Sequence, residues 1–253
     1  MGSLTGKVAI VTGAGAPLGL GRAYAMALAA EGARVVVNDV NESADAVVAE
    51  IVAAGGEAVS VLAPVGSREA ASTILAAALD AFGRVDILVN NAGIVAFTPV
   101  LDLEEDLWDR VFAVHVKGSA MNTSVVARWM VDNDVKGSII NITSTAGIYG
   151  TPEGGSEYSA AKSAIVGMTK SHSRELAPRG IRVNAVAPGA LTLDPAMMPP
   201  QFKELAEGMV KSSVLGRVGL PADVAPTVVF LASDQAHYVT GQIIAATGNS
   251  GVA

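Results

Sequence analysis

Short apolar runs alternate along the chain with longer segments in which apolar residues recur every three or four positions. The short runs are rich in Val and Ile, which is typical of strands buried on both faces. They are Lys7–Thr12, Arg34–Asn38, Ala58–Leu62, Val85–Asn90, Ser138–Thr143, Ile181–Val186 and Gln242–Ala246. The longer segments have helical spacing and are Leu20–Glu31, Ser43–Ala54, Arg68–Phe82, Glu105–Val131, Glu157–Ala177 and Ala222–Ser233. This alternation predicts a doubly wound α/β fold with a parallel sheet covered by helices on both faces.

The composition favours one domain and narrows the choice of partners. No repeat, low-complexity tract or interdomain linker interrupts the 253 residues, so we expect a single domain over 1–253. A net charge of −7 disfavours binding to nucleic acid, because phosphates repel an acidic surface. The chain has no cysteine, which excludes disulfides and thiolate sites and fits a reducing, cytoplasmic setting. No apolar run has transmembrane character, and we expect no membrane partner.

The stretch Ser138–Lys162 carries the strongest candidate chemistry. Tyr158 and Lys162 are four residues apart and share one face of a predicted helix. Ser144 follows the end of a predicted strand, at the sheet edge where α/β proteins bind ligands. A phenol, an ammonium and a hydroxyl at this edge can form a proton-transfer site. The alternative is a solvated helix face and a capping hydroxyl.

The first predicted strand runs into a glycine-rich turn, TGAGAPLGLGRA, and then into a helix. Gly13, Gly19 and Gly21 allow a tight turn and a close backbone approach to a pyrophosphate at the helix N-terminus. The literal G-x-G-x-x-G spacing is not matched, because position 18 is Leu. Glycine-rich turns of this type also occur for packing alone.

Asp39 ends the second predicted strand, 18 residues after Gly21. A carboxylate at this place can accept hydrogen bonds from ribose hydroxyls. It would repel a 2′-phosphate, and neither the glycine-rich loop nor the residues beside Asp39 offer a basic side chain. The sequence therefore favours NAD over NADP; the other interpretation makes Asp39 a turn or cap residue.

Several further segments complete a family pattern: Asn90–Gly93 (NNAG), Tyr158–Lys162 (YSAAK), Asn184–Gly189 (NAVAPG) and LASDQAHYVTGQ near the C-terminus. With the glycine-rich turn and Ser144, they make the chain resemble the short-chain dehydrogenase/reductase family over essentially its full length. The resemblance implies a Rossmann-type sheet of about seven strands, a nicotinamide cofactor, no metal, and a homo-oligomer, with a tetramer favoured over a dimer.

The resemblance also implies residue roles. Tyr158 would be the general acid/base, Ser144 would hydrogen-bond the substrate oxygen, and Lys162 would bind the nicotinamide ribose and lower the pKa of the tyrosine. The cofactor would contact Gly13, Gly19, Leu20, Gly21, Asp39, Val65, Asn91, Ala92, Gly93, Tyr158, Lys162, Pro188, Gly189 and Thr192. The substrate would contact Val95, Ala146, Tyr149, Leu191, Met197 and Met198.

The chain departs from the family pattern at four places. Its glycine-rich turn is two residues longer than usual, and Pro64 stands where an adenine-contacting Asp is usual. Tyr158 lies 14 residues after Ser144, one more than is common. His115 replaces the usual catalytic Asn. An imidazole titrates near neutrality and can join a proton relay, or His115 can be a buried structural residue.

The expected substrate lining is apolar and has no Arg clamp, which favours a hydrophobic secondary alcohol or ketone over a free acid. Acyl thioesters, steroid-like compounds and terpenoids all fit, and a V-H-V-[KR]-G run resembles the (3R)-hydroxyacyl-CoA dehydrogenase part of peroxisomal multifunctional enzymes. The segment 193–210 would be a lid, or its Met197–Pro200 part would only cap the core. The alternatives are a catalytically inactive dinucleotide-binding sensor or scaffold, and an NADP-dependent 3-oxoacyl reductase.

Overall fold

The computed structural model describes residues 2–95, 97–151, 154–189, 191, 210 and 213–248. Within them, seven parallel strands form one sheet in the order β3-β2-β1-β4-β5-β6-β7. The strands are β1 (Val8–Thr12), β2 (Arg34–Asp39), β3 (Ala58–Leu62), β4 (Ile87–Asn90), β5 (Ser138–Ile142), β6 (Arg182–Pro188) and β7 (Ile243–Ala246). The predicted doubly wound α/β fold is confirmed, and every predicted strand is present within three residues of its expected bounds.

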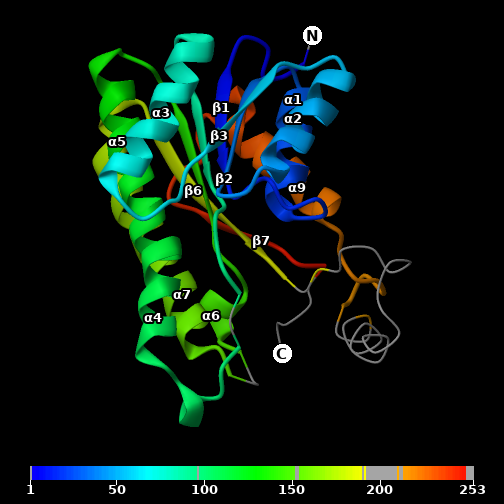
Figure 1. Cartoon of the computed structure of the whole chain (residues 1–253), viewed down its shortest axis with the longest axis vertical. Helices are drawn as coiled ribbons and strands as arrows, with labels where there is room; N and C mark the ends of the chain where they lie inside the picture. Colours follow the sequence, from blue (N-terminus) through cyan, green and yellow to red (C-terminus); the bar gives the residue numbers. More distant parts are fainter. Residues whose placement is uncertain are drawn as a thin grey trace.

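The helices cover both faces of the sheet. They are α1 (Leu20–Ala30), α2 (Ser43–Ala53), α3 (Arg68–Phe82), α4 (Glu105–Phe112), α5 (Gly118–Asp132), α6 (Ala146–Tyr149), α7 (Ser156–Leu176) and α9 (Pro221–Ala232), with short turns η1 (Val100–Asp102), η2 (Ala113–Lys117), η3 (Ala177–Arg179) and η5 (Asp234–Ala236). In Figure 1, α1, α2 and α9 lie on one side of the sheet, and α3, α5 and α7 lie on the other. One apolar core contains residues of α1, α2 and α9, and the other contains residues of α3 and α5.

Two features depart from the predicted elements. The pattern predicts one helix over Glu105–Val131, but a π-helical turn, η2, divides it into α4 and α5. The segment Ala113–Lys117 contains no Gly or Pro that would signal an interruption, so the sequence does not reveal this turn. The short helix α6 between Ser144 and Tyr158 is also absent from the prediction.

The order of the strands places the candidate site. The chain reverses direction across the sheet between β1 and β4, and ligands bind at such a switch point. Val11 pairs with Val89, Asn90 pairs with Asn141, and Ile142 pairs with Val186, so the carboxyl ends of β1, β4, β5 and β6 lie at one edge. The glycine-rich turn follows β1, Asn91–Gly93 follows β4, Ser144 follows β5, and Gly189 follows β6, whereas Asp39 ends β2, Val65 follows β3 and His115 lies in η2.

Candidate dinucleotide and substrate cleft

A cleft of about 1550 Å³ opens at this edge of the sheet. All predicted site residues that the structure describes line it: Gly13, Gly19, Leu20, Gly21, Asp39, Val65, Asn91, Ala92, Gly93, Val95, His115, Ser144, Ala146, Tyr149, Tyr158, Lys162, Pro188, Gly189 and Leu191. Thr192, Met197, Met198 and the predicted lid, apart from Val210, lie outside the described residues. Eight segments of the described chain, separated in the sequence, therefore meet around one cleft.

At Gly13, Gly19 and Gly21 the glycine-rich turn presents backbone, rather than side chains, to this cleft. Gly13 has a φ of +62°, and a Cβ there would lie 2.6 Å from Ala92 Cα. A Cβ on Gly21 would lie 2.4 Å from the carbonyl oxygen of Gly13, so α1 packs directly on the turn. No side chain caps α1 at Gly19, and its first N–H groups remain available to an anion. This cradle fits the pyrophosphate of a dinucleotide.

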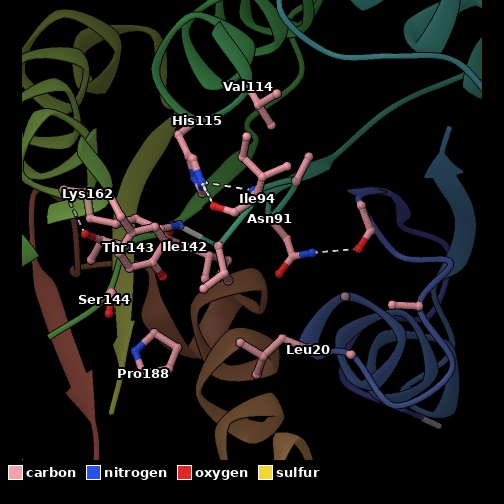
Figure 2. A pocket seen from close by; sticks show the side chains of 18 of the residues that line it. Leu20, Asn91, Ile94, Val114, His115, Ile142, Thr143, Ser144, Lys162 and Pro188 are labelled. Atoms are coloured by element: carbon pink, nitrogen blue, oxygen red, sulfur yellow. Dashed lines mark hydrogen bonds between the residues drawn. The ribbon is translucent and has the colours of Figure 1, made fainter. Parts of the chain in front are cut away.

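Hydrogen bonds tie the end of β4 to the same turn. The Thr12 hydroxyl accepts the N–H groups of Asn91 and Ala92, at 3.0 and 3.1 Å. The Asn91 amide donates to the carbonyl oxygens of Thr12 and Gly13, both at 2.9 Å, and Figure 2 shows this side chain reaching the turn. The floor of the cleft is therefore built by β1 and β4 together.

The end of the cleft at Asp39 has no basic lining. Among the described lining residues, Lys162 is the one Lys or Arg, and it belongs to the opposite region around Tyr158. Arg22 of α1 does not line the cleft, and its guanidinium is paired with Glu50 of α2 (Nε–Oε1 3.2 Å). The neighbours of Asp39 in the lining are Ala16, Pro17, Val40, Asn41 and Ser43.

Lys162 is buried and rigidly held. Its ammonium donates to the carbonyl oxygen of Ile142 at 2.8 Å, and the Thr143 hydroxyl donates to the Lys162 carbonyl at 2.7 Å. Figure 2 shows the three residues side by side at the end of β5. A Cβ on Gly147 would lie 2.6 Å from the Lys162 carbonyl carbon, so α6 packs directly on α7. Burial lowers the pKa of Lys162 to about 7.

A buried amide network behind the cleft fixes α7 against the sheet. The Asn90 amide donates to Asn141 Oδ1, and the Asn141 amide donates to the Thr169 hydroxyl, both at 2.9 Å. Asn90 also donates to the Thr123 hydroxyl of α5 at 3.1 Å. These bonds set the position of the helix that carries Tyr158 and Lys162.

Tyr158 faces Lys162, His115 and Phe97. The Lys162 ammonium lies 5.5 Å from the centre of the Tyr158 ring, and the ring of Phe97 lies 6.0 Å away at 57°. Burial raises the pKa of Tyr158, and a hydrogen bond with the Ser144 hydroxyl lowers it by less. The expected lowering of this pKa by Lys162 is not found. Burial is the largest influence on this pKa, and a lysine with a pKa of about 7 is only partly charged at neutral pH.

His115 lies in the π-helical turn with its ring edge-on to Tyr158, at 5.5 Å between ring centres. Its Nε2 lies 2.8 Å from the carbonyl oxygen of Ile94 and 3.1 Å from the Ile94 N–H (Figure 2). A Cβ on Gly93 would lie 2.3 Å from His115 Cε1, so this imidazole needs glycine in the NNAG segment. Burial and the nearby Lys162 charge lower the pKa of His115 to about 4. It does not titrate near neutrality, contrary to the expectation from its ordinary pKa.

The fold and the cleft are those of a dinucleotide-binding oxidoreductase, and the comparisons with known proteins agree with this class. A family model described as enoyl-(acyl carrier protein) reductase matches residues 13–248. The chain belongs to the short-chain dehydrogenase/reductase family. This family uses a nicotinamide dinucleotide.

Individual relatives cover almost the whole chain. A 3-oxoacyl-[acyl-carrier-protein] reductase of Synechocystis sp. is 45% identical over 245 residues, which are 96% of each chain. The 3-oxoacyl-[acyl-carrier-protein] reductase FabG of Thermotoga maritima is 39% identical over 97% of this chain and 98% of its own. The crystal structure of a short-chain type dehydrogenase/reductase from Mycobacterium marinum has a TM-score of 0.91 at 32% identity, covering 99% of this chain and 97% of that one.

Sequence reasoning missed three residues of the site. Phe97 lies in the cleft lining with its ring beside that of Tyr158, and the one feature of the sequence that could have indicated this is its place four residues after Gly93. Thr12 links two strands through its hydroxyl, and a polar residue ending an apolar run was its signal. Gly15 contacts Asp39 through its N–H, which the sequence did not indicate.

Proposed function

We propose that this protein is an NAD-dependent oxidoreductase that interconverts a hydrophobic secondary alcohol and the corresponding ketone. One observation carries the proposal: Tyr158, Ser144 and Lys162 line the same cleft as the glycine-rich turn and Asp39. A proton-transfer group and a dinucleotide cradle in one cleft are what a carbonyl reduction requires.

The residues present fit a nicotinamide dinucleotide. The turn from Gly13 to Gly21 would hold its pyrophosphate, Asp39 its adenosine ribose, and Asn91–Gly93 and Lys162 its nicotinamide end. Beyond these, Leu20, Val65, Pro188 and Gly189 would line its path. When bound, the cofactor supplies or accepts the hydride.

The proton would pass through Tyr158. Because its pKa is raised, the phenol is protonated at neutral pH and is ready to donate to the oxygen of a bound ketone. Ser144 would hydrogen-bond the same oxygen. Lys162 would orient the tyrosine and the ribose from its fixed place on the Ile142 carbonyl. In alcohol oxidation the phenol must first lose its proton, so that direction requires a higher pH.

His115 is proposed as a positioning residue. It holds Ile94 and lies against the Tyr158 ring, so it supports both the substrate wall and the acid/base group. A proton relay through an imidazolium is disfavoured near neutral pH, because the buried ring is neutral there.

The second candidate function is an NADP-dependent 3-oxoacyl reductase, which the names of the relatives favour. Against it, the cleft presents a carboxylate and no basic side chain at its Asp39 end, among the described residues. An acyl carrier protein is acidic, and exposed Glu104, Glu105 and Asp106 border the loop that carries Val95 and Phe97. We therefore favour a substrate that is not delivered on such a carrier.

The substrate wall is apolar: Val95, Phe97, Ala146, Tyr149 and Leu191 line the cleft near Tyr158. Exposed apolar side chains around a reactive group favour a hydrophobic ligand. Predicted contacts at Met197 and Met198 would extend this lining.

The family and the composition bear on the oligomeric state and on the cellular location. We propose a homo-oligomer, tetramer rather than dimer, in the cytoplasm, from the habit of the family and the absence of cysteine. None of the helices in the described part of the chain is long and apolar enough to span a bilayer. No group of three His, Asp or Glu residues within it is placed to hold a metal ion.

The test is spectrophotometric. NADH formation from a panel of hydrophobic secondary alcohols, and NADH loss with the matching ketones, are compared for the wild type and Tyr158→Phe. Loss of the acid/base group is expected to lower kcat by about 10²–10⁴-fold. Tyr238→Phe is the matched control, because this phenol is 95% exposed and lies outside the cleft. Equal turnover by Tyr158→Phe and wild type would refute the mechanism, and tight NADH binding without turnover would favour the inactive sensor.

A further inference from the structure

The longer glycine-rich loop, Ala14–Leu18, is anchored at three points. The Ala14 N–H donates to the carbonyl oxygen of Asn38 at 2.9 Å, and the Gly15 N–H donates to Asp39 Oδ2 at 2.8 Å. At the far end, the Gly19 N–H donates to the Ala16 carbonyl oxygen at 2.9 Å. The loop is therefore tied along the end of β2 rather than projecting freely from β1.

The middle anchor requires glycine. Gly15 is buried, and a Cβ there would lie 2.8 Å from Ser43 Oγ, 2.9 Å from Ala44 N and 3.0 Å from Asp39 Cβ. One of these neighbours is backbone in the first turn of α2, which cannot yield as a flexible side chain would. Any larger residue must lift the loop away from Asp39.

The same contact fixes the Asp39 carboxylate. Its Oδ1 accepts the N–H groups of Val40 and Asn41, at 2.8 and 3.2 Å, while Oδ2 accepts from Gly15. A carboxylate has about four acceptor positions, so Oδ2 retains one for a ligand hydroxyl. The side chain is thus oriented by donors from the two residues that follow β2 and from the glycine-rich loop.

The anchored loop also forms part of the cleft wall. Ala16 and Pro17 are exposed and line the cleft together with Asp39, and neither can neutralise an anion. A ligand group beside Asp39 therefore meets a fixed negative charge and an apolar loop. A hydroxyl can satisfy this carboxylate by donating, whereas a phosphate cannot.

We propose that Gly15 is a cofactor-specificity residue, because its N–H holds both the Asp39 carboxylate and the Ala16–Pro17 wall in the arrangement that accepts a ribose 2′-hydroxyl and rejects a 2′-phosphate. The inference rests on the proposed dinucleotide function. It adds that Asp39 alone does not set the preference and that the lengthened loop contributes to it.

The test measures equilibrium dissociation constants of NADH and NADPH by titration calorimetry, without substrate. The wild type should bind NADH about 10²-fold more tightly than NADPH, from charge repulsion in a partly solvated site. Gly15→Ala keeps the carboxylate but lifts the loop, and should reduce this ratio to below about tenfold. Asp39→Asn removes the charge and should bring the ratio close to one; its single amide oxygen can accept from Gly15 or from Val40 and Asn41, but not from both sides.

If Gly15→Ala does not fold, NADPH binding to a second variant tests the role of the loop. Ala16→Arg places a guanidinium on the exposed, anchored loop beside Asp39 and should strengthen NADPH binding at least about tenfold. Gly167→Ala is the matched glycine control, because it lies in α7 with no atom within 4 Å of its added Cβ. It should leave both constants unchanged.

The outcomes separate the inference from the function on which it rests. A folded Gly15→Ala with the wild-type ratio, or Ala16→Arg with unchanged NADPH affinity, overturns the role of the loop while the dinucleotide function stands. A wild type that binds neither cofactor overturns the proposed function itself.

Discussion

Replacing Lys162 by Met should abolish activity and yet stabilise the protein at acidic pH. Lys162 is only 4% exposed, and burial lowers its pKa to about 7. The unfolded chain carries the ordinary pKa of 10.5, so folding at low pH must desolvate a charged ammonium. Methionine fills a similar volume and carries no charge.

The magnitude follows from the two pKa values. They differ by about 3.5, and each pKa unit is worth 1.36 kcal/mol, so the charged side chain costs roughly 5 kcal/mol well below pH 7. The folded pKa is depressed, so the unfolded chain binds the extra proton and stability rises with pH between about 7 and 10.5. At pH 9 the cost has fallen to about 2 kcal/mol. Losing the hydrogen bond to Ile142 offsets about 1–3 kcal/mol at either pH.

Urea unfolding followed by circular dichroism at pH 6 and pH 9, at one protein concentration, measures both values. We expect Lys162→Met to be more stable than the wild type by about 2–4 kcal/mol at pH 6. At pH 9 the two proteins should differ by about 3 kcal/mol less than at pH 6. The change with pH is the sharper test, because the lost hydrogen bond cancels from it. A difference independent of pH would show that Lys162 is not desolvated as described.

Three further results are expected. His115→Asn can accept from and donate to Ile94 through its amide and should keep kcat/KM within about threefold, whereas His115→Phe should lower kcat/KM about tenfold. Because the pKa of His115 is about 4, neither variant should change the pH profile of kcat between pH 5 and 8. A changed profile would contradict a positioning role. Gly21→Ala should lower the free energy of unfolding by about 1–3 kcal/mol and weaken NADH binding, because the added Cβ would lie 2.4 Å from the carbonyl oxygen of Gly13. An unchanged midpoint of urea unfolding would contradict this packing. As pH rises through the raised pKa of Tyr158, ketone reduction should fall and alcohol oxidation should rise in initial-rate assays, and a pH-independent ratio of the two rates would argue against this tyrosine.

The sequence predicted the fold well because each local preference agrees with the final packing. Strand runs such as Ala58–Leu62 and helices such as Arg68–Phe82 carry their own boundary signals, including the Ser67 cap and Gly83 in the left-handed conformation. Parallel strands covered on both faces need continuous apolar runs, and the sequence contains them. The π-helical turn was missed because Ala113–Lys117 carries no Gly, Pro or capping signal that would interrupt a helix.

The pKa values of the site residues were harder to predict from the sequence than the identity of those residues. The family motifs place Tyr158 and Lys162 in one cleft, but their pKa values depend on burial by residues distant in sequence. An expected charge attraction between them loses to desolvation, and no spacing rule can show that balance. The bond between Gly15 and Asp39 likewise joins two segments 24 residues apart and requires the folded loop.

The groups proposed for proton transfer and those proposed for substrate contact lie on different parts of this molecule. Lys162 is bonded to β5, and α7 is held by buried amides, so the groups proposed for proton transfer rest on the sheet itself. The proposed substrate wall, by contrast, lies on the loop after β4 and at the end of the short helix α6: Val95 is 70% exposed, Phe97 59% and Tyr149 56%. Loop side chains can change with little effect on the core that holds the chemistry. A relative of 45% identity can therefore share the family of this chain and still differ from it in substrate: here the proposed wall is apolar, and the neighbouring helix α4 begins with Glu105 and Asp106.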